Sequence, residues 1–326
     1  MPDGSPHWAE AREAGAGWQL RLMRWTALRL PPIVVDPLLW LVAFAFSINP
    51  RRPANAASID YLTRMHRRRP TLVERHRHAL TFAHMFHERV RLLATGTEGF
   101  TITAHGSETV IDLVGQGKGG VLLGAHFGSF EALRAFDRKL PGLNVRYLMY
   151  PDHAEHSTKL LRELNPEVAD RVISLVDGPQ AMMEVFEALD RGQFVAFLGD
   201  RLPRRDLRGT LSVPFLRGQI DIPTSPYIAA IAAQVPLILC LAPRLGKDRY
   251  DLSFIELYDG APVARRKRDA TIKALGHRYA KALEDMCRRH PDNWFNFFDI
   301  WGDGEDLQRP SADRSIRGPQ RAAARR

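Results

Sequence analysis

Short apolar runs alternate with amphipathic segments along the chain from residue 100 onwards. Five runs have the length and composition of buried strands: residues 100–104, 120–123, 145–149, 172–176 and 194–198. The segments between them have the composition of helices: residues 108–114, 130–139, 156–164 and 181–189. This alternation predicts an α/β fold with a mixed, partly parallel sheet flanked by helices.

The pattern changes after residue 200. Residues 211–215, and the pair 237–242 and 251–257, predict antiparallel strands added at one edge of the sheet. Residues 271–288 then place Ile272, Leu275, Tyr279, Leu283 and Met286 on one stripe, which predicts a final amphipathic helix. Beyond residue 301 the composition is dominated by Gly, Asp, Pro, Ala and Arg, so we expect a disordered basic tail over residues 302–326.

The N-terminal part of the chain is helical in composition. We expect residues 1–17 to be flexible, residues 18–95 to form a helical, membrane-associating region and residues 96–301 to form the α/β domain. The apolar stretch 33–48 is shorter than the ~20 residues of a membrane-spanning helix. An interfacial or half-inserted helix with Trp40 at headgroup level and a buried core helix are both compatible with it.

Charge narrows the classes of partner. The 326 residues carry a net charge of +9, which favours a nucleic acid, an anionic membrane surface or an acidic carrier protein. Cys240 and Cys287 are far from other metal ligands in the sequence and are typical of buried thiols in a reducing compartment. His84 and His87 are better interpreted as part of a solvated basic helix than as a metal site, so no metal is expected.

The strongest candidate for catalysis is His126, which follows the apolar run 120–123. Ser129 is a candidate helix N-cap, so His126 lies at a turn between a strand and a helix. We expect Glu131 to reach back to one imidazole nitrogen, which would leave the other nitrogen free to act as a general base. The N–H groups of Gly128 and Ser129 would then stabilise an oxyanion at the start of the helix.

A second constellation, Asp200 and Arg201, directly follows the apolar run 194–198. Because the carboxyl ends of parallel strands meet at one rim of a sheet, we expect both residues to lie on the same rim as His126. The planar guanidinium of Arg201 suits a phosphate or carboxylate group. A surface ion pair with Asp200 or Asp206 is the alternative interpretation.

These residues carry a resemblance to a known family. His126 to Glu131 resembles the H-x-x-x-x-[D/E] motif of the lysophospholipid acyltransferase superfamily, and Gly199-Asp200-Arg201 is similar to its bacterial lipid A biosynthesis branch. The segment 213–218, with Phe215 and Gly218, resembles a block that would line an acyl-chain tunnel. The segment 145–150, with Arg146 and Tyr150, resembles a substrate-contacting block, and the aromatic run 293–299 resembles the closing segment of a related subgroup.

The resemblance implies a glycerolipid acyltransferase-like fold and an enzyme with His126 and Glu131 as catalytic residues. It would move a fatty acyl group from a thioester on acyl carrier protein or coenzyme A to a hydroxyl or amine of a lipid or glycolipid. The other site residues would bind substrate: Gly128, Ser129, Arg146, Tyr150, Asp200, Arg201, Phe215 and Gly218. No bound cofactor is implied.

Location and partners follow from the same resemblance. It implies the cytoplasmic face of a bacterial inner membrane, with peripheral binding or a single N-terminal anchor, and an anionic membrane surface as partner. Two other functions stay open: a lipid hydrolase or thioesterase, although no G-x-S-x-G motif is present, and an inactive basic protein that binds membranes or nucleic acid. A basic run fits an anionic lipid or an acidic acyl carrier as well as a nucleic acid: Arg265, Arg266, Lys267 and Arg268. Because no nucleic-acid-binding motif is present, no nucleic acid is expected as a partner.

Overall fold

The computed structural model describes residues 17–50, 52–137, 140–149, 163–175, 179–202 and 209–301. The helices are α1 Gly17–Arg29, α2 Pro32–Ser47, α3 Pro53–His66, α4 Leu72–Thr95, α5 Glu108–Gly115, α6 Phe130–Asp137, α8 Pro166–Ala169, α9 Pro179–Asp190, α10 Ser225–Ala233 and α11 Arg268–Arg289, with short 3-10 turns η2 Arg265–Lys267 and η3 Pro291–Asn293. The strands are β1 Thr101–His105, β2 Val121–Gly124, β3 Val145–Met149, β4 Val172–Ser174, β5 Phe194–Leu198, β6 Thr210–Phe215, β7 Gly218–Pro223, β8 Leu237–Leu241, β9 Arg244–Gly246 and β10 Arg249–Tyr258.

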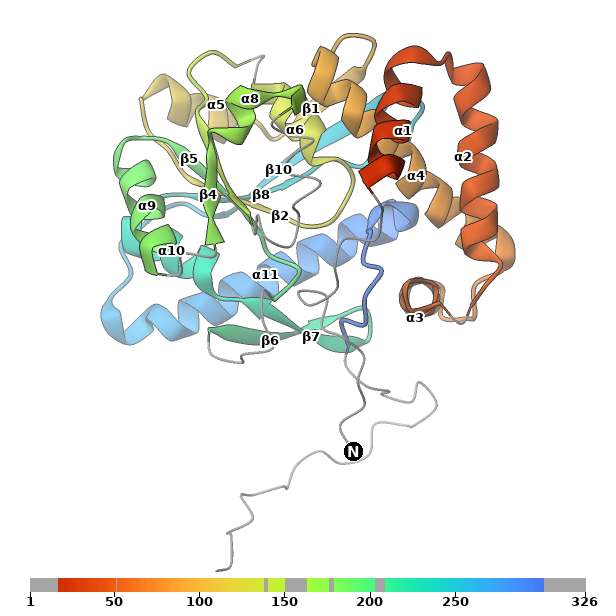
Figure 1. The fold of residues 1–326 in the computed structure, drawn as a ribbon. Helices are drawn as coiled ribbons and strands as arrows, with labels where there is room; N and C mark the ends of the chain where they lie inside the picture. Colours follow the sequence, from red (N-terminus) through yellow and green to blue (C-terminus); the bar gives the residue numbers. More distant parts are fainter. Residues whose placement is uncertain are drawn as a thin grey trace, which may run out of the picture.

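The central sheet has eight strands in the order β1-β10-β8-β2-β5-β3-β4, with β9 paired to β10 (Figure 1). Strands β8, β2, β5, β3 and β4 run parallel, and β10 is antiparallel to β8. The prediction of a mixed, partly parallel sheet flanked by helices is therefore confirmed.

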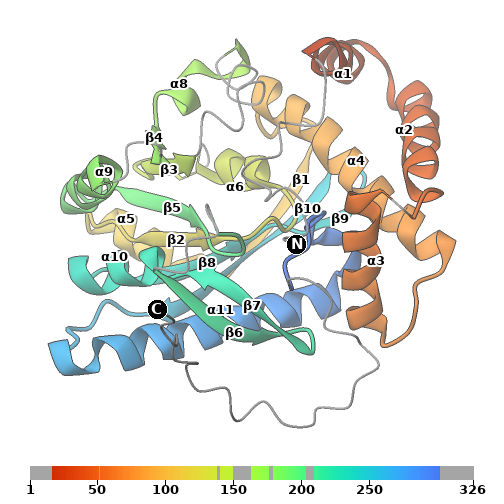
Figure 2. The ribbon, with the colours of Figure 1, turned by 60° about the horizontal axis from the view of Figure 1, so that its bottom comes forward.

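Two details of the predicted sheet were wrong. Strand β8 is not an edge addition: it pairs with β2 in the middle of the sheet, and β10 separates it from β1. Strand β6 pairs with β7 in a separate two-stranded ribbon below the sheet (Figure 2). The apolar pattern indicates that a strand is buried but not which strands pair with it, so the sequence could not predict the strand order.

Helices cover both faces of the sheet, and the period-two alternation along β8 shows how. Leu237, Leu239 and Leu241 face a core shared with α9, α10 and α11, whereas Ile238 and Cys240 face a second core shared with α5 and α6. Both sets are buried because a strand with helices on each face exposes neither side to water. The stripe predicted for the final helix lies in the first of these cores.

Helix α4 is central to the N-terminal helices, because α1, α2 and α3 each pack against it. The helical region breaks at Arg67, which has a left-handed backbone (φ 59°), and α4 then begins at a capping box between Thr71 and Glu74. Helix α3 contributes Tyr61 and Leu62 to the main core, so it belongs to the same packed body as the sheet.

Helices α1 and α2 lie outside that body, at one side of the molecule (Figures 1 and 2). Helix α2 buries Val35 and Ala43 but leaves Ile33 81% and Leu41 58% exposed. It is therefore not the buried core helix of the alternative interpretation. Among the helices described, none combines the length and the apolar character needed to cross a bilayer.

Candidate active site

His126 occupies the turn between β2 and α6. Its neighbours Ala125 and Phe127 are buried in the main core, whereas the imidazole keeps 26% of its side-chain surface exposed. Gly128 follows with φ +64°, and a Cβ there would lie 1.8 Å from the carbonyl oxygen of Ala242. Only glycine fits this close approach. Ser129 caps α6 as expected, because its Oγ accepts the N–H of Ala132 at 3.2 Å.

The residue that holds the imidazole is Asp200. Its Oδ1 lies 2.9 Å from His126 Nδ1, and its Oδ2 accepts the backbone N–H of His126 at 2.9 Å. Gly124, at the end of β2, is in register with Leu198, at the end of β5, so the two strands deliver both side chains to the same rim. The expected shared rim is confirmed.

The electrostatics of this pair define its protonation. Burial would raise the pKa of Asp200, but the His126 imidazole, Arg201 and the His126 N–H outweigh it and hold that pKa at about 2. Burial and the positive charge of Arg201 lower the pKa of His126, against the opposing charge of Asp200. At neutral pH the carboxylate only accepts hydrogen bonds, so Nδ1 carries the imidazole proton and Nε2 presents its lone pair.

Glu131 does not orient the imidazole, and this prediction was wrong. Its Oε1 accepts from Arg89 on α4 at 2.9 Å and from Arg134 at 3.4 Å, and its side chain is 2% exposed. Glu131 is the second residue of α6, beyond the turn that carries His126, and two cationic side chains occupy it there. Asp200 takes the place that the H-x-x-x-x-E spacing assigned to Glu131.

The predicted oxyanion donors are also occupied. The N–H of Gly128 donates to the carbonyl of Asn293 at 2.8 Å, and that of Ser129 donates to the carbonyl of Ala242 at 2.9 Å. These bonds hold the turn against β8 and the chain that follows α11. Among the described residues, the N–H groups of Phe130 and Glu131 have no acceptor, so the first turn of α6 retains free donors.

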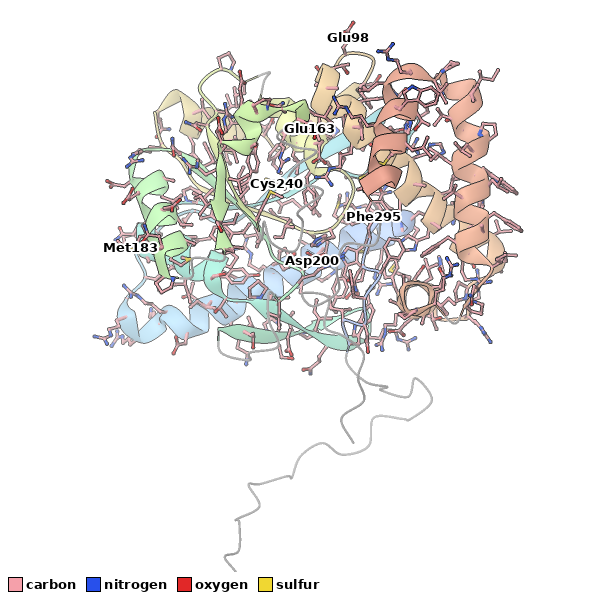
Figure 3. The ribbon with its side chains drawn as sticks, viewed as in Figure 1. Glu98, Glu163, Met183, Asp200, Cys240 and Phe295 are labelled. Atoms are coloured by element: carbon pink, nitrogen blue, oxygen red, sulfur yellow. The ribbon has the colours of Figure 1, made fainter. Side chains whose placement is uncertain are left out.

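The segment after α11 is the part of the site that the sequence did not assign. Trp294, which is fully buried, donates its indole N–H to Asp200 Oδ2 at 3.0 Å. Phe295 donates its N–H to the carbonyl of His126 at 2.7 Å. Figure 3 shows Asp200 near the middle of the molecule, close to Phe295. The aromatic run 293–298 was the available signal, but its composition alone gives no partner.

Arg201 lies on the rim with part of its guanidinium engaged, whereas its buried Nε has no hydrogen-bond partner in the described part of the chain. It donates to the carbonyl of Phe295 at 2.8 Å and covers the ring of Phe298 at 4.9 Å. Burial lowers its pKa to about 10, with Asp200 opposing the shift. Arg201 therefore holds the segment that follows α11, residues 293–301, which we call the closing segment, and acts electrostatically on His126. Neither its hydrogen bond to Phe295 nor its contact with Phe298 is a surface ion pair.

The remaining predicted site residues are not gathered at His126. Arg146 is in register with Val195 and hence level with Val121, five residues before His126, which is about 16 Å along the sheet. Its ion-pair partner is Glu184 on α9, at 4.0 Å. Tyr150 lies outside the described residues.

Phe215 and Gly218 belong to packed structure. The Phe215 ring is buried between Trp294 and Trp301, with centroids 5.1 and 6.3 Å away. Gly218 packs so closely on Arg64 and Trp301 that a Cβ would lie 2.6 Å from each. Both residues support the closing segment from below, so neither is free to line a tunnel as expected.

No family model matches the sequence, and no curated protein matches it. Within the described parts of the chain, no group of three or more His, Cys, Asp or Glu side chains is placed to hold a metal ion. His84 instead lies 4.0 Å from Asp36 of α2.

Proposed function

We propose that this protein is an acyltransferase that moves an acyl group from a thioester to a hydroxyl or amine of a lipid acceptor. The observation that carries the proposal is the His126–Asp200 pair, in which a fully buried carboxylate fixes Nδ1 of a partly exposed imidazole and leaves Nε2 to accept a proton. The resemblance of residues 126–131 and 199–201 to the lysophospholipid acyltransferase superfamily supports the substrate class and a fold of the glycerolipid acyltransferase type.

In the proposed reaction Nε2 of His126 removes the proton of the acceptor hydroxyl as its oxygen attacks the thioester carbonyl. A carbon–oxygen bond forms, and the carbonyl oxygen becomes an oxyanion near the free N–H groups of Phe130 and Glu131 at the start of α6. Collapse of this intermediate breaks the carbon–sulfur bond, and the imidazolium returns its proton to the leaving thiolate. Asp200 stabilises the imidazolium throughout.

Helices α1 and α2 supply the contact with the membrane in this proposal. Trp25 is 54% and Trp40 48% exposed, and most of the large apolar residues of α2 face outward. Exposed arginines lie close by in the chain at Arg29 and Arg52. A helix of sixteen residues with such a face suits the interface of an anionic bilayer, where the acceptor lipid is found. The proposed location is the cytoplasmic face of a bacterial inner membrane, with peripheral binding or a single N-terminal anchor.

The test uses the full-length protein with a fatty acyl thioester and a bacterial lipid extract. Wild type is expected to release free thiol only when lipid is present, and mass spectrometry is expected to show an acylated lipid. His126→Ala should lose this transfer while circular dichroism and vesicle binding are retained. Transfer at the wild-type rate by His126→Ala refutes the proposal, and thiol release without lipid indicates the thioesterase alternative.

A further inference from the structure

Four exposed cations precede and begin α11: Arg265, Arg266, Lys267 and Arg268, here called the α11 basic cluster. In the described part of the chain none of the four makes an ion pair. Cations farther along the same helix do: Lys281 pairs with Asp285 at 2.5 Å, and Arg288 pairs with Glu284 at 2.6 Å. Two cations in the second half of α11 are therefore neutralised, whereas none of the four at its start is.

This arrangement opposes the electrostatics of the helix itself. The start of a helix carries partial positive charge, so cations there are unfavourable. Lys267 occupies the N-cap position and makes no capping bond with its side chain, and Asp269 is the acid present in the first turn. The cluster therefore destabilises the start of α11 without a compensating ion pair, and such a departure from local stability is typical of a binding surface.

Exposed apolar side chains lie at the same end of the molecule. Met183 on α9 is 59% exposed and Ile228 on α10 is 44% exposed, and α10 packs against both α9 and α11. Figure 3 shows Met183 at this edge. Apolar side chains, methionine among them, together with arginine are typical of protein–protein interfaces. Cations next to exposed apolar side chains favour an acidic protein as the partner, because binding to the phosphates of a nucleic acid would require only the cations.

The position of the cluster separates it from the membrane-facing helices. In both views α11 starts at the opposite end of the molecule from α1 and α2 (Figures 1 and 2). A flat bilayer that contacts α1 and α2 therefore does not also contact the α11 basic cluster. The partner of the cluster approaches from solution.

We infer that the α11 basic cluster, with the exposed side chains of α9 and α10, docks the acidic surface of the acyl carrier protein that delivers the donor thioester. This inference rests on the proposed acyltransferase function. Arg268 precedes Tyr279 by eleven residues, about 16 Å along the helix axis. The Tyr279 hydroxyl donates to the carbonyl of Gly124 at the end of β2, beside the turn of His126. Helix α11 thus connects the docking surface to the strand that leads into the turn of His126.

The experiment measures binding of a carrier protein that bears its phosphopantetheine arm but no acyl group. The test variant is the triple substitution Arg265→Gln, Arg266→Gln and Lys267→Gln. The matched control removes three charges from the other end of the same helix: Lys281→Gln, Arg288→Gln and Arg289→Gln. At low salt the test variant should bind at least about tenfold more weakly and the control within about twofold of wild type. Thermal unfolding should show a test variant at least as stable as wild type, because the removed charges opposed the helix.

Three results overturn the inference: no binding by wild type, equal binding by wild type and the test variant, or equal weakening in both variants. Loss of binding to anionic vesicles or duplex DNA in the test variant, with carrier binding unchanged, assigns the cluster to those ligands and also overturns it. Because no turnover is involved, carrier binding that depends on the cluster supports the docking surface even if the protein transfers no acyl group. The absence of acyl transfer would then refute the proposed reaction and not the docking surface.

Discussion

Asp200→Asn tests the geometry at its most specific point, because it changes one atom in a fully buried side chain. Three N–H groups converge on the two carboxylate oxygens: the backbone N–H of His126 and the indole of Trp294 at Oδ2, and the imidazole at Oδ1. An amide has one oxygen and one N–H₂ group. The arrangement that satisfies most donors places the amide oxygen at the backbone and indole N–H groups, and the N–H₂ group at the imidazole.

The consequence falls on the imidazole tautomer. Nδ1 of His126 must then accept a hydrogen bond from the amide, so the ring proton moves to Nε2. Nε2 then has no lone pair to remove the acceptor proton in the proposed reaction. In a serine protease triad the same Asp→Asn change lowers kcat about 10⁴-fold while the geometry is kept, and we expect a loss of about 10³- to 10⁴-fold here. The fold itself should be retained, since two of the three hydrogen bonds survive.

Two assays together separate this mechanism from simple damage. Thiol release from the acyl thioester in the presence of lipid gives the rate, and nitrogen-15 NMR of labelled histidine reports which ring nitrogen of His126 carries the proton. The control is Asp248→Asn, which breaks the 2.6 Å ion pair with Arg91 away from the imidazole and should leave both readouts unchanged. A rate within tenfold of wild type, or an unchanged tautomer in Asp200→Asn, would refute the reasoning.

Four further predictions follow from the same structure. The pKa of Asp200 falls from 3.8 in the unfolded chain to about 2 in the folded protein, so its ionised carboxylate adds about 2 kcal/mol to the free energy of unfolding above pH 4, and this contribution is lost as pH falls towards 2. In urea unfolding at several pH values, the free energies of unfolding of wild type and Asp200→Asn should therefore converge in acid. Arg201→Gln should raise the pKa of His126 and move the acid limb of the rate profile to higher pH, and an unmoved limb would show that Arg201 exerts no field there. Glu131→Ala leaves two half-buried guanidinium groups, those of Arg89 and Arg134, without their carboxylate and should lower the free energy of unfolding in urea by about 3 kcal/mol. Glu131→Gln should keep the His126 tautomer, and loss of activity with unchanged stability would instead place Glu131 in the chemistry. Gly128→Ala forces a Cβ against a carbonyl oxygen at φ +64° and should cost about 1 to 3 kcal/mol or more by the same measurement, so neutral behaviour would contradict the close approach.

Local patterns predicted the elements better than their neighbours. The strands at 145–149 and 194–198 have the bounds that their apolar runs indicated, and the final helix begins three residues before and ends one residue after its expected range. Edge and central strands share the same apolar signature, so β8 was misplaced in the sheet. The expected helix at 156–164 falls largely outside the described residues, as do residues 1–16 and the tail beyond residue 301.

The site shows the same division between local and non-local information. The strand end that carries Asp200 was enough to place it beside His126, because parallel strands share a rim. The choice between Asp200 and Glu131 as the imidazole partner was not available, since it depends on Arg89, 42 residues earlier in the chain, occupying Glu131. Trp294 was missed for the same reason. Its hydrogen bond to Asp200 spans 94 residues, and the residues next to Trp294 in the sequence do not indicate which side chain its indole N–H contacts.

The segment that follows α11 also sets when the protein becomes competent during its synthesis. Residues 293–295 bond to the turn of His126 and to Asp200, yet Trp294 is synthesised 94 residues after Asp200. A nascent chain that already contains both catalytic side chains therefore lacks the indole that completes the acceptor set of Asp200 and the strand-like contacts that hold the turn. The proposed base is therefore complete only after residues 293–295 have been added, and a chain truncated before Trp294 contains His126 and Asp200 without the bonds that hold them.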